Sequence, residues 1–575
     1  MSFANRVERL RIDAEPLISH LARPWPGVVL FLSTSDGHSR ARVLQVTGKT
    51  LADAWRLLDA EIDQHWGAIE DSLRWLRLDW VTAVRSSTWG RFREDLKSVK
   101  RNYCRQGLAL DSRLSRAFLE QELNANAMLY GGSKIPHAVV NDKNFRLYAR
   151  RRFPDWSGDL SDDAPVFPLT TRGLFCDGTN PPLALLPSGR HAGRRDIETL
   201  DEACVRGLIG RASSYLATQV QNSGRFNYGW HPCFDRPIRA YNSLRHASTL
   251  YSMIEAWEVN RDRHLADAIA RSLGYLTNVL IKTVDVPAGP AAFLVDPGGE
   301  IKLGGNAVCL LALSKYSEVA KTSRYLSLLE QLALGIVHMQ DANSGRFVHV
   351  LHYPSLAVKS PFRIIYYDGE AAFGLMRLYR LTGDERWLAA VEQAFDWFIA
   401  QEHWRAHDHW LSYCVNELTI HRPEEKYFRF GLQNIADYLD FVLTRITTFP
   451  TLLELMMAAS DMIRRLEAFP DYCYLLDDFD RDKFERALEF RARYLLNGHF
   501  WPEMAMFFKN PARIVGSFFI RHQAFRVRID DVEHYLSGYV AYLHRVRTGG
   551  SVTPKKTFVL KVERQACASG GQRAE

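Results

Sequence analysis

The sequence of 575 residues lacks the short motifs that mark several large enzyme classes. It contains no GxxxxGK(S/T) phosphate loop, no GxGxxG turn that opens a βαβ unit, no GxSxG turn and no HExxH helix. These absences count against nucleotide-dependent enzymes, serine hydrolases built on a GxSxG turn, and zinc proteases of the HExxH type.

Long apolar runs and paired cysteines are missing as well. The opening stretch, residues 1–22, is charged throughout and has no signal-peptide core, and no run of about 18 uncharged apolar residues occurs anywhere. The eight cysteines are scattered singly, unlike those of a disulfide framework or a zinc ribbon. We therefore expect a cytoplasmic protein with reduced thiols and no membrane span.

A strong excess of one charge is also absent, because the formal net charge is only +7. Basic clusters occur near residues 97–105 and 146–152, and we interpret them as solvated faces. No nucleic-acid partner is predicted. The composition, with 47% hydrophobic and 24% charged residues, is typical of a globular chain long enough for several structural units.

Residues 1–156 mix strand and helix periodicities, which predicts a small α+β domain. Its expected elements are strands at 28–33 and 41–46, a helix at 51–66, a strand at 75–84, a helix at 91–103 and a strand at 144–148. Residues 157–195 are rich in Pro, Gly, Asp and Ser, which predicts an irregular linker. Residues 549–575 contain two Gly-Gly pairs and few apolar side chains, which predicts a flexible tail.

From residue 196 to residue 548 the sequence repeats itself. The stretch 250–262 resembles 372–384, each an apolar helix, a polar turn with Asp and a second helix, at an offset of 122 residues. The sequences QNSGRF at 221–226 and QDANSGRF at 340–347 repeat in nearly the same register. A related pattern halfway between gives a unit of about 60 residues, or one helical hairpin.

Six such hairpins fit the interval. Outer helices are expected near 198–220, 262–282, 322–340, 384–402, 426–444 and 476–497, and inner helices are expected to begin near 241, 304, 367, 408, 450 and 531. Irregular loops favour a closed ring over an open solenoid. The predicted fold class is mainly α, an (α/α)6 toroid preceded by the smaller α+β domain.

This arrangement resembles the six-hairpin glycosidase superfamily in the broad sense, which includes unsaturated glucuronyl hydrolases and N-acylglucosamine 2-epimerases. The resemblance covers about 350 residues and rests on helix-pair periodicity and loop chemistry. It implies a carbohydrate-active enzyme, and it assigns no catalytic residue.

Polar residues gather where the inner helices are expected to begin. His246, Asn306 and Asp368 occupy equivalent positions in the repeat, and helix capping is the alternative role for each. The run from Tyr366 through Tyr367 to Glu370 places two carboxylates beside two aromatic rings. Sugar sites need such acids and stacking platforms, so we select Asp368 and Glu370 as acid and base, with a capping turn as the alternative.

Two further segments add imidazole and guanidinium groups. His409 and His534 are candidate proton carriers together with His246, although packing or capping is the alternative for His409. His407 and His409 point apart on a helix, so no metal site is predicted. Arg526 and Arg528 lie on one face of an extended segment, where they bind a substrate carboxylate or else pair with Asp530 and Asp531. The remaining candidate contacts with substrate are Trp230, Tyr367, Asn306 and Asp531.

The leading hypothesis is an enzyme that acts by acid/base chemistry on an acidic, uronate-type sugar or oligosaccharide, as a hydrolase, lyase or epimerase without a cofactor. The alternative is a non-catalytic binding or assembly module in cell-envelope polymer synthesis, with a protein partner at the N-terminal domain. A metal-dependent cyclase or transferase is a third class. The first hypothesis requires acidic and imidazole groups to meet in one cavity, whereas a scaffold disperses them in caps and salt bridges.

Overall fold

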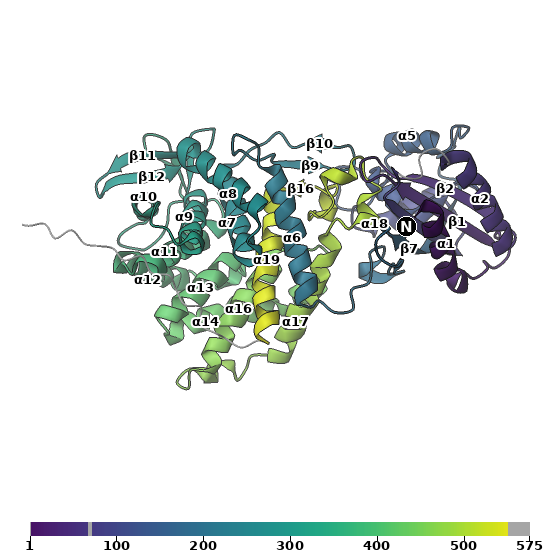
Figure 1. The fold of residues 1–575 in the computed structure, drawn as a ribbon. Helices are drawn as coiled ribbons and strands as arrows, with labels where there is room; N and C mark the ends of the chain where they lie inside the picture. The colour runs from purple at the N-terminus through teal and green to yellow at the C-terminus, as the bar shows by residue number, and fades with distance from the viewer. Residues whose placement is uncertain (1, 67–71, 550–575) are drawn as a thin grey trace, which may run out of the picture.

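The computed structural model describes residues 2–66 and 72–549. It has two parts, an N-terminal α+β domain and a larger ring of helical hairpins (Figure 1). The predicted fold class is therefore confirmed. The predicted tail lies, apart from Gly549, outside the described residues. Among the helices that are described, none has the length and apolar character needed to cross a bilayer.

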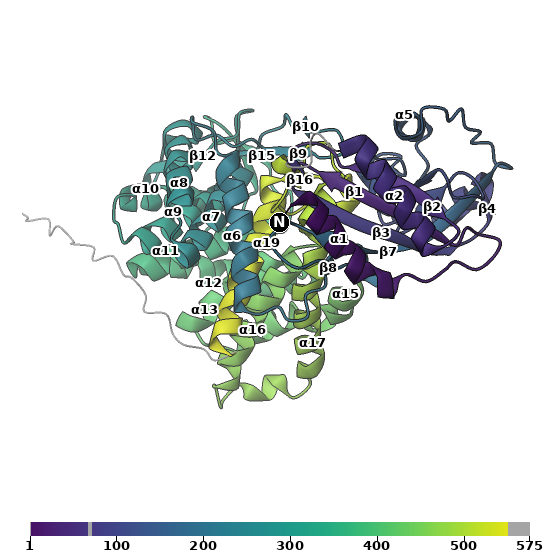
Figure 2. The ribbon, with the colours of Figure 1, turned by 45° about the vertical axis from the view of Figure 1, so that its right-hand side comes forward.

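The N-terminal domain is built on one antiparallel sheet, whose strands follow the order β2-β1-β3-β7-β5-β6, with β4 and β8 also pairing with β7. Its strands are β1 (Val28–Ser35), β2 (Arg42–Gly48), β3 (Trp75–Val84), β4 (Ser87–Thr88), β5 (Gly107–Ala109), β6 (Ala117–Phe118), β7 (Pro165–Cys176) and β8 (Leu183–Ala184). Its helices are α1 (Phe3–Ala14), α2 (Leu51–Trp66), α3 (Trp89–Lys97), α4 (Glu120–Ala125) and α5 (Asp142–Arg152). Helices α1 and α2 lie on one face of the sheet (Figure 2).

Two predictions for this domain are wrong. The interval 157–195 is not irregular, because it contains β7, which pairs with β3 along most of its length and with β5 near its start. Prolines and glycines in and around β7 made its sequence look irregular. The backbone of β7 nevertheless pairs with β3 and with β5. The strand expected at 144–148 is part of α5, where Phe145, Tyr148 and Ala149 are buried at helical spacing.

The ring consists of six inner helices, each preceded by an outer helical segment, within the described residues. The inner helices are α7 (Ser243–Asn260), α9 (Leu303–Ala320), α11 (Tyr366–Thr382), α13 (His409–His421), α16 (Thr451–Glu467) and α19 (Ile529–Thr548). The outer helices are α6 (Glu202–Gln219), α8 (Arg263–Tyr275), α10 (Leu326–His338), α12 (Glu385–Ala400), α14 (Glu425–Gln433) with α15 (Leu439–Thr444), and α17 (Arg481–Tyr494). Each inner helix contacts the next, and α19 contacts α7, so the ring is closed.

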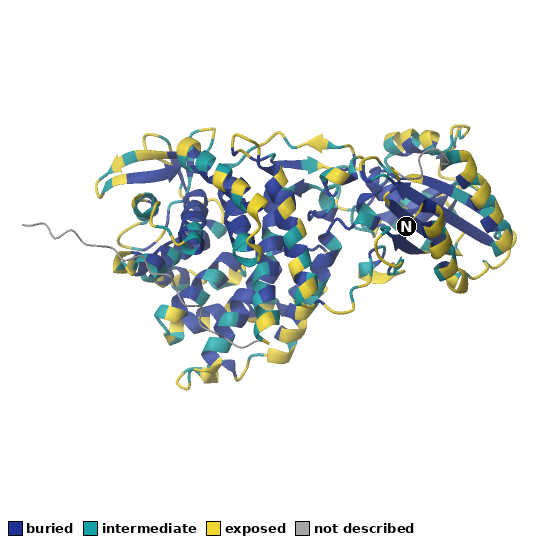
Figure 3. Ribbon diagram, viewed as in Figure 1, coloured by how far each residue is buried: buried dark blue, intermediate teal, exposed yellow. Residues whose placement is uncertain are grey.

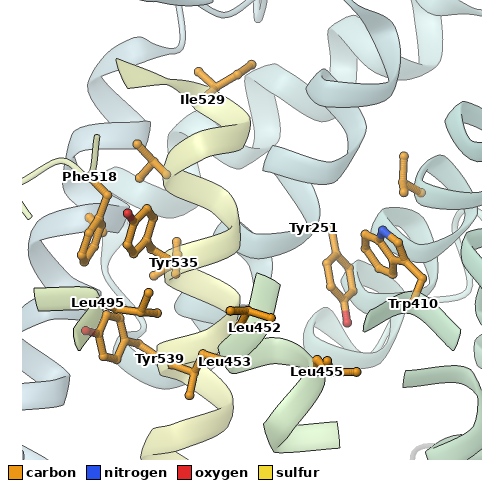
Figure 4. Close-up of a cluster of buried hydrophobic side chains, with 14 of the residues drawn as sticks. Tyr251, Trp410, Leu452, Leu453, Leu455, Leu495, Phe518, Ile529, Tyr535 and Tyr539 are labelled. Carbon is orange, nitrogen blue, oxygen red and sulfur yellow. The ribbon is translucent and has the colours of Figure 1, made fainter. Parts of the chain in front are cut away.

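The inner helices are apolar on more than one face because each packs against neighbouring helices on several sides. Figure 3 shows the inner helices largely buried and the outer helices exposed on their outward sides. The last inner helix, α19, shows this packing in Figure 4, where Ile529, Tyr535 and Tyr539 project from it. The Tyr535 ring stacks on Phe518 with 4.3 Å between centroids, and its hydroxyl donates to Thr448. These contacts pack α19 against the loop that carries Phe518 and against the segment before α16 that carries Thr448.

Buried polar contacts hold the N-terminal domain against the toroid. Arg77 and Asp79 of β3 form an ion pair of 2.8 Å, and Arg77 also donates to the backbone oxygen of Glu503. Asn102 and Arg521 exchange two hydrogen bonds, each through a side chain and a backbone oxygen. Because these groups are almost fully enclosed, their loss would leave unpaired polar atoms. The two parts therefore meet in a specific, polar interface.

Candidate functional site

The candidate site lies where the inner helices begin, because their first turns converge at one rim of the ring. The side chain of Asn242 caps α7, and the side chain of Asp408 caps α13, so both helices start at defined positions. The second turns of two inner helices are in contact, as Ser248 of α7 donates to Glu533 of α19 over 2.7 Å. Residues far apart in sequence are thus brought together by ring closure.

The centre of the site is formed by His409 of α13, Glu454 of α16 and His534 of α19. The two imidazole rings are 5.4 Å apart between centroids, at an angle of 78°. His534 Nδ1 lies 2.9 Å from Glu454 Oε2, and Tyr413 donates to the other oxygen of Glu454 over 3.3 Å. His409 Nδ1 lies 3.1 Å from Asp408 Oδ1, while its Nε2 is buried without a hydrogen-bond partner among the described residues. Two imidazoles in different environments thus meet edge to face.

The charges around His534 set its protonation state. Burial alone would lower the pKa of His534, but the carboxylates of Glu533 and Glu454 outweigh this effect and raise the pKa to about 10. Burial raises the pKa of Glu533 to about 7, with the charge of His534 opposing this shift and that of Glu454 adding to it. At neutral pH His534 is therefore a cation, held in place by at least one ionised carboxylate.

Glu370 of α11 is a buried acid beside this centre. Burial, and then the neighbouring carboxylates of Asp408 and Glu533, raise its pKa well above the ordinary value. Its Oε2 atom has no hydrogen-bond partner among the described residues. Room for this carboxyl comes from Gly304 of α9, where a Cβ atom would lie 1.9 Å from Glu370 Oε2 and 2.5 Å from the Tyr367 ring. Glu370 is therefore a buried carboxyl with a raised pKa, packed against bare backbone.

Replacing Gly304 with alanine should displace Glu370 and Tyr367 and destabilise the protein by about 1–3 kcal/mol, because the core has no space for the methyl group. Gly305→Ala is the matched control, since its nearest neighbour would lie at an ordinary 3.4 Å. Thermal unfolding of both variants checks the prediction. Equal melting temperatures for the two would mean that Glu370 and Tyr367 are free to move.

The arginines predicted to hold a substrate carboxylate are occupied by internal partners. Arg526 binds Asp531 through two hydrogen bonds of 2.8 and 2.9 Å, and Arg528 contacts Asp530 and Asp531. Arg245 of α7 reaches Asp530 over 2.7 Å and so ties the first inner helix to the last. The alternative left open by the sequence, internal pairing, is the arrangement observed. Asp531 therefore holds the segment that leads into α19, and Asp530 joins α19 to α7.

Asn306 and His246 do not join the central cluster. Asn306 is fully buried, accepts from the backbone of Leu294 and donates to that of Lys302, so both ends of its amide are used. His246 is fully buried between Tyr241 and Ser272 of the outer layer, and burial lowers its pKa to about 4. Equivalence in the repeat placed both residues at helix starts, but their side chains serve packing.

Asp368, Tyr367 and Trp230 also have structural partners. Asp368 lies in the first turn of α11, 3.2 Å from His349 Nε2, and it is not the cap of that helix. Tyr367 is buried against Gly304, so its ring offers no open face. Trp230 donates to Gln219 and its ring is covered by Arg513 at 4.0 Å. These three residues lie outside the His409–His534 centre.

Of the described residues, one set of three has the geometry for a metal ion, namely His409, Glu454 and His534, whose ligand atoms lie within 4.8 Å of one another. However, Glu454 and His534 are already bonded to each other, and His534 carries a proton. Metal binding would have to displace that proton.

Sequence reasoning found His409, His534 and Glu370 but missed Glu454 and Glu533. Glu533 lies within a segment that was singled out for its arginines, and its adjacency to His534 was the available signal. Glu454 falls in the first turn of the fifth inner helix, whose start was predicted. The register of the repeat could have selected it, although the surrounding apolar sequence gave no local indication of a site.

Comparison with known proteins yields no family model and no curated relative for this chain. Solved structures with a similar fold include cellobiose 2-epimerase from Bacillus thermoamylovorans B4167, at 11% identity and TM-score 0.46, covering 60% of this chain and 99% of that one. A D-mannose isomerase matches at 11% identity and TM-score 0.45, covering 60% and 97%. An unsaturated glucuronyl hydrolase specific for heparin matches at 11% and 0.43, covering 60% and 98%. The predicted resemblance to six-hairpin proteins is thus confirmed, and it concerns the fold alone.

Proposed function

We propose that this protein is a carbohydrate-active enzyme that transfers protons at a sugar carbon, as an epimerase or isomerase. The observation that carries the proposal is the pair of facing imidazoles, His409 and His534, in unlike environments. His409 Nε2 is buried without a hydrogen-bond partner among the described residues, so we assign it as the base, and we assign His534, a cation, as the acid. One base and one acid are what such a reaction requires.

The chemistry follows from these two states. His409 Nε2 removes the proton on the carbon next to the carbonyl of an open-chain sugar. His534 supplies a proton to the oxygen or the carbon that receives the electrons, and Glu454 stabilises its charge. Atoms and electrons balance within the substrate, so this proposal needs no cofactor.

A second candidate reaction, glycoside hydrolysis, is favoured by the buried carboxyl of Glu370, whose pKa is raised. A carboxylic acid with a raised pKa can donate a proton to a leaving oxygen, and an ionised neighbour then assists. In the epimerase proposal, Glu370 instead donates a hydrogen bond to a substrate hydroxyl.

Turnover assays on neutral and uronate-containing mono- and oligosaccharides test the proposal. Product analysis should find epimers or aldose–ketose isomers with the glycosidic bonds intact. Shorter saccharides would support the hydrolase candidate. A lack of turnover across the panel, with folded protein, would favour the non-catalytic binding module.

A further inference from the structure

A pocket lies where the N-terminal domain meets the loops that lead into the ring. It has a volume of about 530 Å³. The N-terminal domain contributes Arg101 and Tyr130, the β9–β10 turn contributes Phe234 and Arg236, and the segment before α19 contributes Arg526. Strands β9 (Gly229–His231), β10 (Arg236–Pro237) and β16 (Val527–Arg528) form the small sheet beside it (Figure 1). The pocket is thus built by both parts of the chain.

The charge in this pocket is one-sided. None of the described residues that line it is Asp or Glu, whereas three are arginines. Arg526 is neutralised by Asp531, but Arg101 donates only to the backbone oxygens of Ser133 and Ile135. Arg236 forms no ion pair with any described residue and lies 5.5 Å from the Phe234 ring. Two guanidinium charges are therefore uncompensated.

The residues around the pocket are consistent with a positive electrostatic potential. The nearest acid in sequence, Asp235, is turned to Arg513 over 2.7 Å. Burial, and then the charges of Lys100 and Arg101, lower the pKa of the nearby His522 to about 4. Burial, followed by Arg526 and Arg236, also lowers the pKa of His231. Several like charges thus lie close together with no acid among the described lining residues, and Arg236 is exposed and accessible to an anion.

We propose that this interdomain pocket binds the oxyanion group, carboxylate or phosphate ester, of a charged saccharide, with Arg101 and Arg236 as its principal ligands. The proposal rests on the proposed function only for the saccharide part of the ligand. Guanidinium groups form charge-assisted, paired hydrogen bonds with such oxyanions, and the rings of Tyr130 and Phe234 offer apolar surface for a sugar. It gives the N-terminal domain a role in choosing the substrate.

The position of the pocket connects it to the acid/base centre. Arg526 lines the pocket and binds Asp531, and Asp531 also binds Arg528, whose other partner is Asp530. Arg245 of α7 joins the same chain of ion pairs. These ion pairs link the pocket to the first turn of α19, the helix that also carries His534. In this proposal the acidic group of the substrate predicted from the sequence binds at Arg101 and Arg236.

Calorimetric titration tests the proposal without requiring turnover. The probes are a tetrasaccharide of galacturonic acid, mannose 6-phosphate and, as the neutral control, cellotetraose. At least one charged probe should bind, more weakly in high salt, and Arg101→Gln with Arg236→Gln should weaken that binding by about tenfold or more. The charged probe that binds shows whether the oxyanion comes from a uronate chain or from a sugar phosphate.

Arg239→Gln is the matched control, because Arg239 is exposed in the same loop and does not line the pocket. A lack of binding by both charged probes would overturn the proposal, as would equal binding by cellotetraose or unchanged binding to the double variant. Turnover assays on the wild-type protein separate the two proposals. Wild-type protein that binds a charged probe but turns over no saccharide would retain the pocket and reject the epimerase.

Discussion

His409→Asn is expected to lower turnover by about 100- to 10,000-fold, the usual contribution of a general base. Asparagine cannot accept a proton, so the step at the sugar carbon loses its base. Stability should change little, because the Nε2 atom of His409 makes no hydrogen bond with the described residues. Steady-state kinetics and thermal unfolding of the variant measure the two effects.

His407→Asn is the matched control two residues away. His407 stacks on Tyr438 with 4.2 Å between ring centroids and contacts the backbone oxygen of Asn434, outside the central cluster. It should retain nearly full turnover. If His409 and His534 act as one unit, a variant with both histidines replaced by asparagine should be no slower than the slower of the two single variants. Full activity of His409→Asn would remove His409 from the mechanism.

Glu454→Gln is expected to lower the pKa of His534 by at least about one unit, because the carboxylate that holds the imidazolium is lost. The amide oxygen of glutamine still accepts from Nδ1, so the loss of stability at neutral pH should be about 1–3 kcal/mol. Titration of the His534 ring signals by NMR measures the pKa directly. An unchanged pKa would show that Glu533 alone holds the charge.

The dependence of this effect on pH follows from the direction of the shift. The folded-state pKa of His534, about 10, is above the ordinary value, so its stabilisation is complete below about pH 6.5 and is lost as the pH rises towards 10. The difference between wild type and Glu454→Gln should shrink over that range. Glu467→Gln is the control on the same helix, because Glu467 forms only an exposed pair with Arg481.

Much of the fold could be predicted from the sequence because it is locally encoded. Helix α2 and strand β3 have the predicted bounds, and the inner helices begin close to the predicted positions, since apolar periodicity and polar caps mark them. Strand β7 could not be predicted in this way. Its stability comes from β3 and β5, far away in the sequence, and local composition does not record those partners.

The candidate site was predictable only in part, for the same reason. His409 and His534 were selected from local chemistry, yet their contact depends on closure of the ring between α19 and its neighbours. The pairing of Arg526 with Asp531 was weighed from the sequence, because the two residues are close along the chain. The two uncompensated arginines, Arg101 and Arg236, come from different domains, so no local pattern joins them.

Solvent exchange tests the central claim most directly. A saccharide that is turned over in the panel should be incubated with the protein in D₂O and followed by NMR. Proton transfer through His409 and His534 predicts deuterium at the sugar carbon beside the carbonyl, at a rate that falls with His409→Asn. Conversion of the sugar without deuterium at any carbon, or exchange that is unaffected by His409→Asn, would contradict the account.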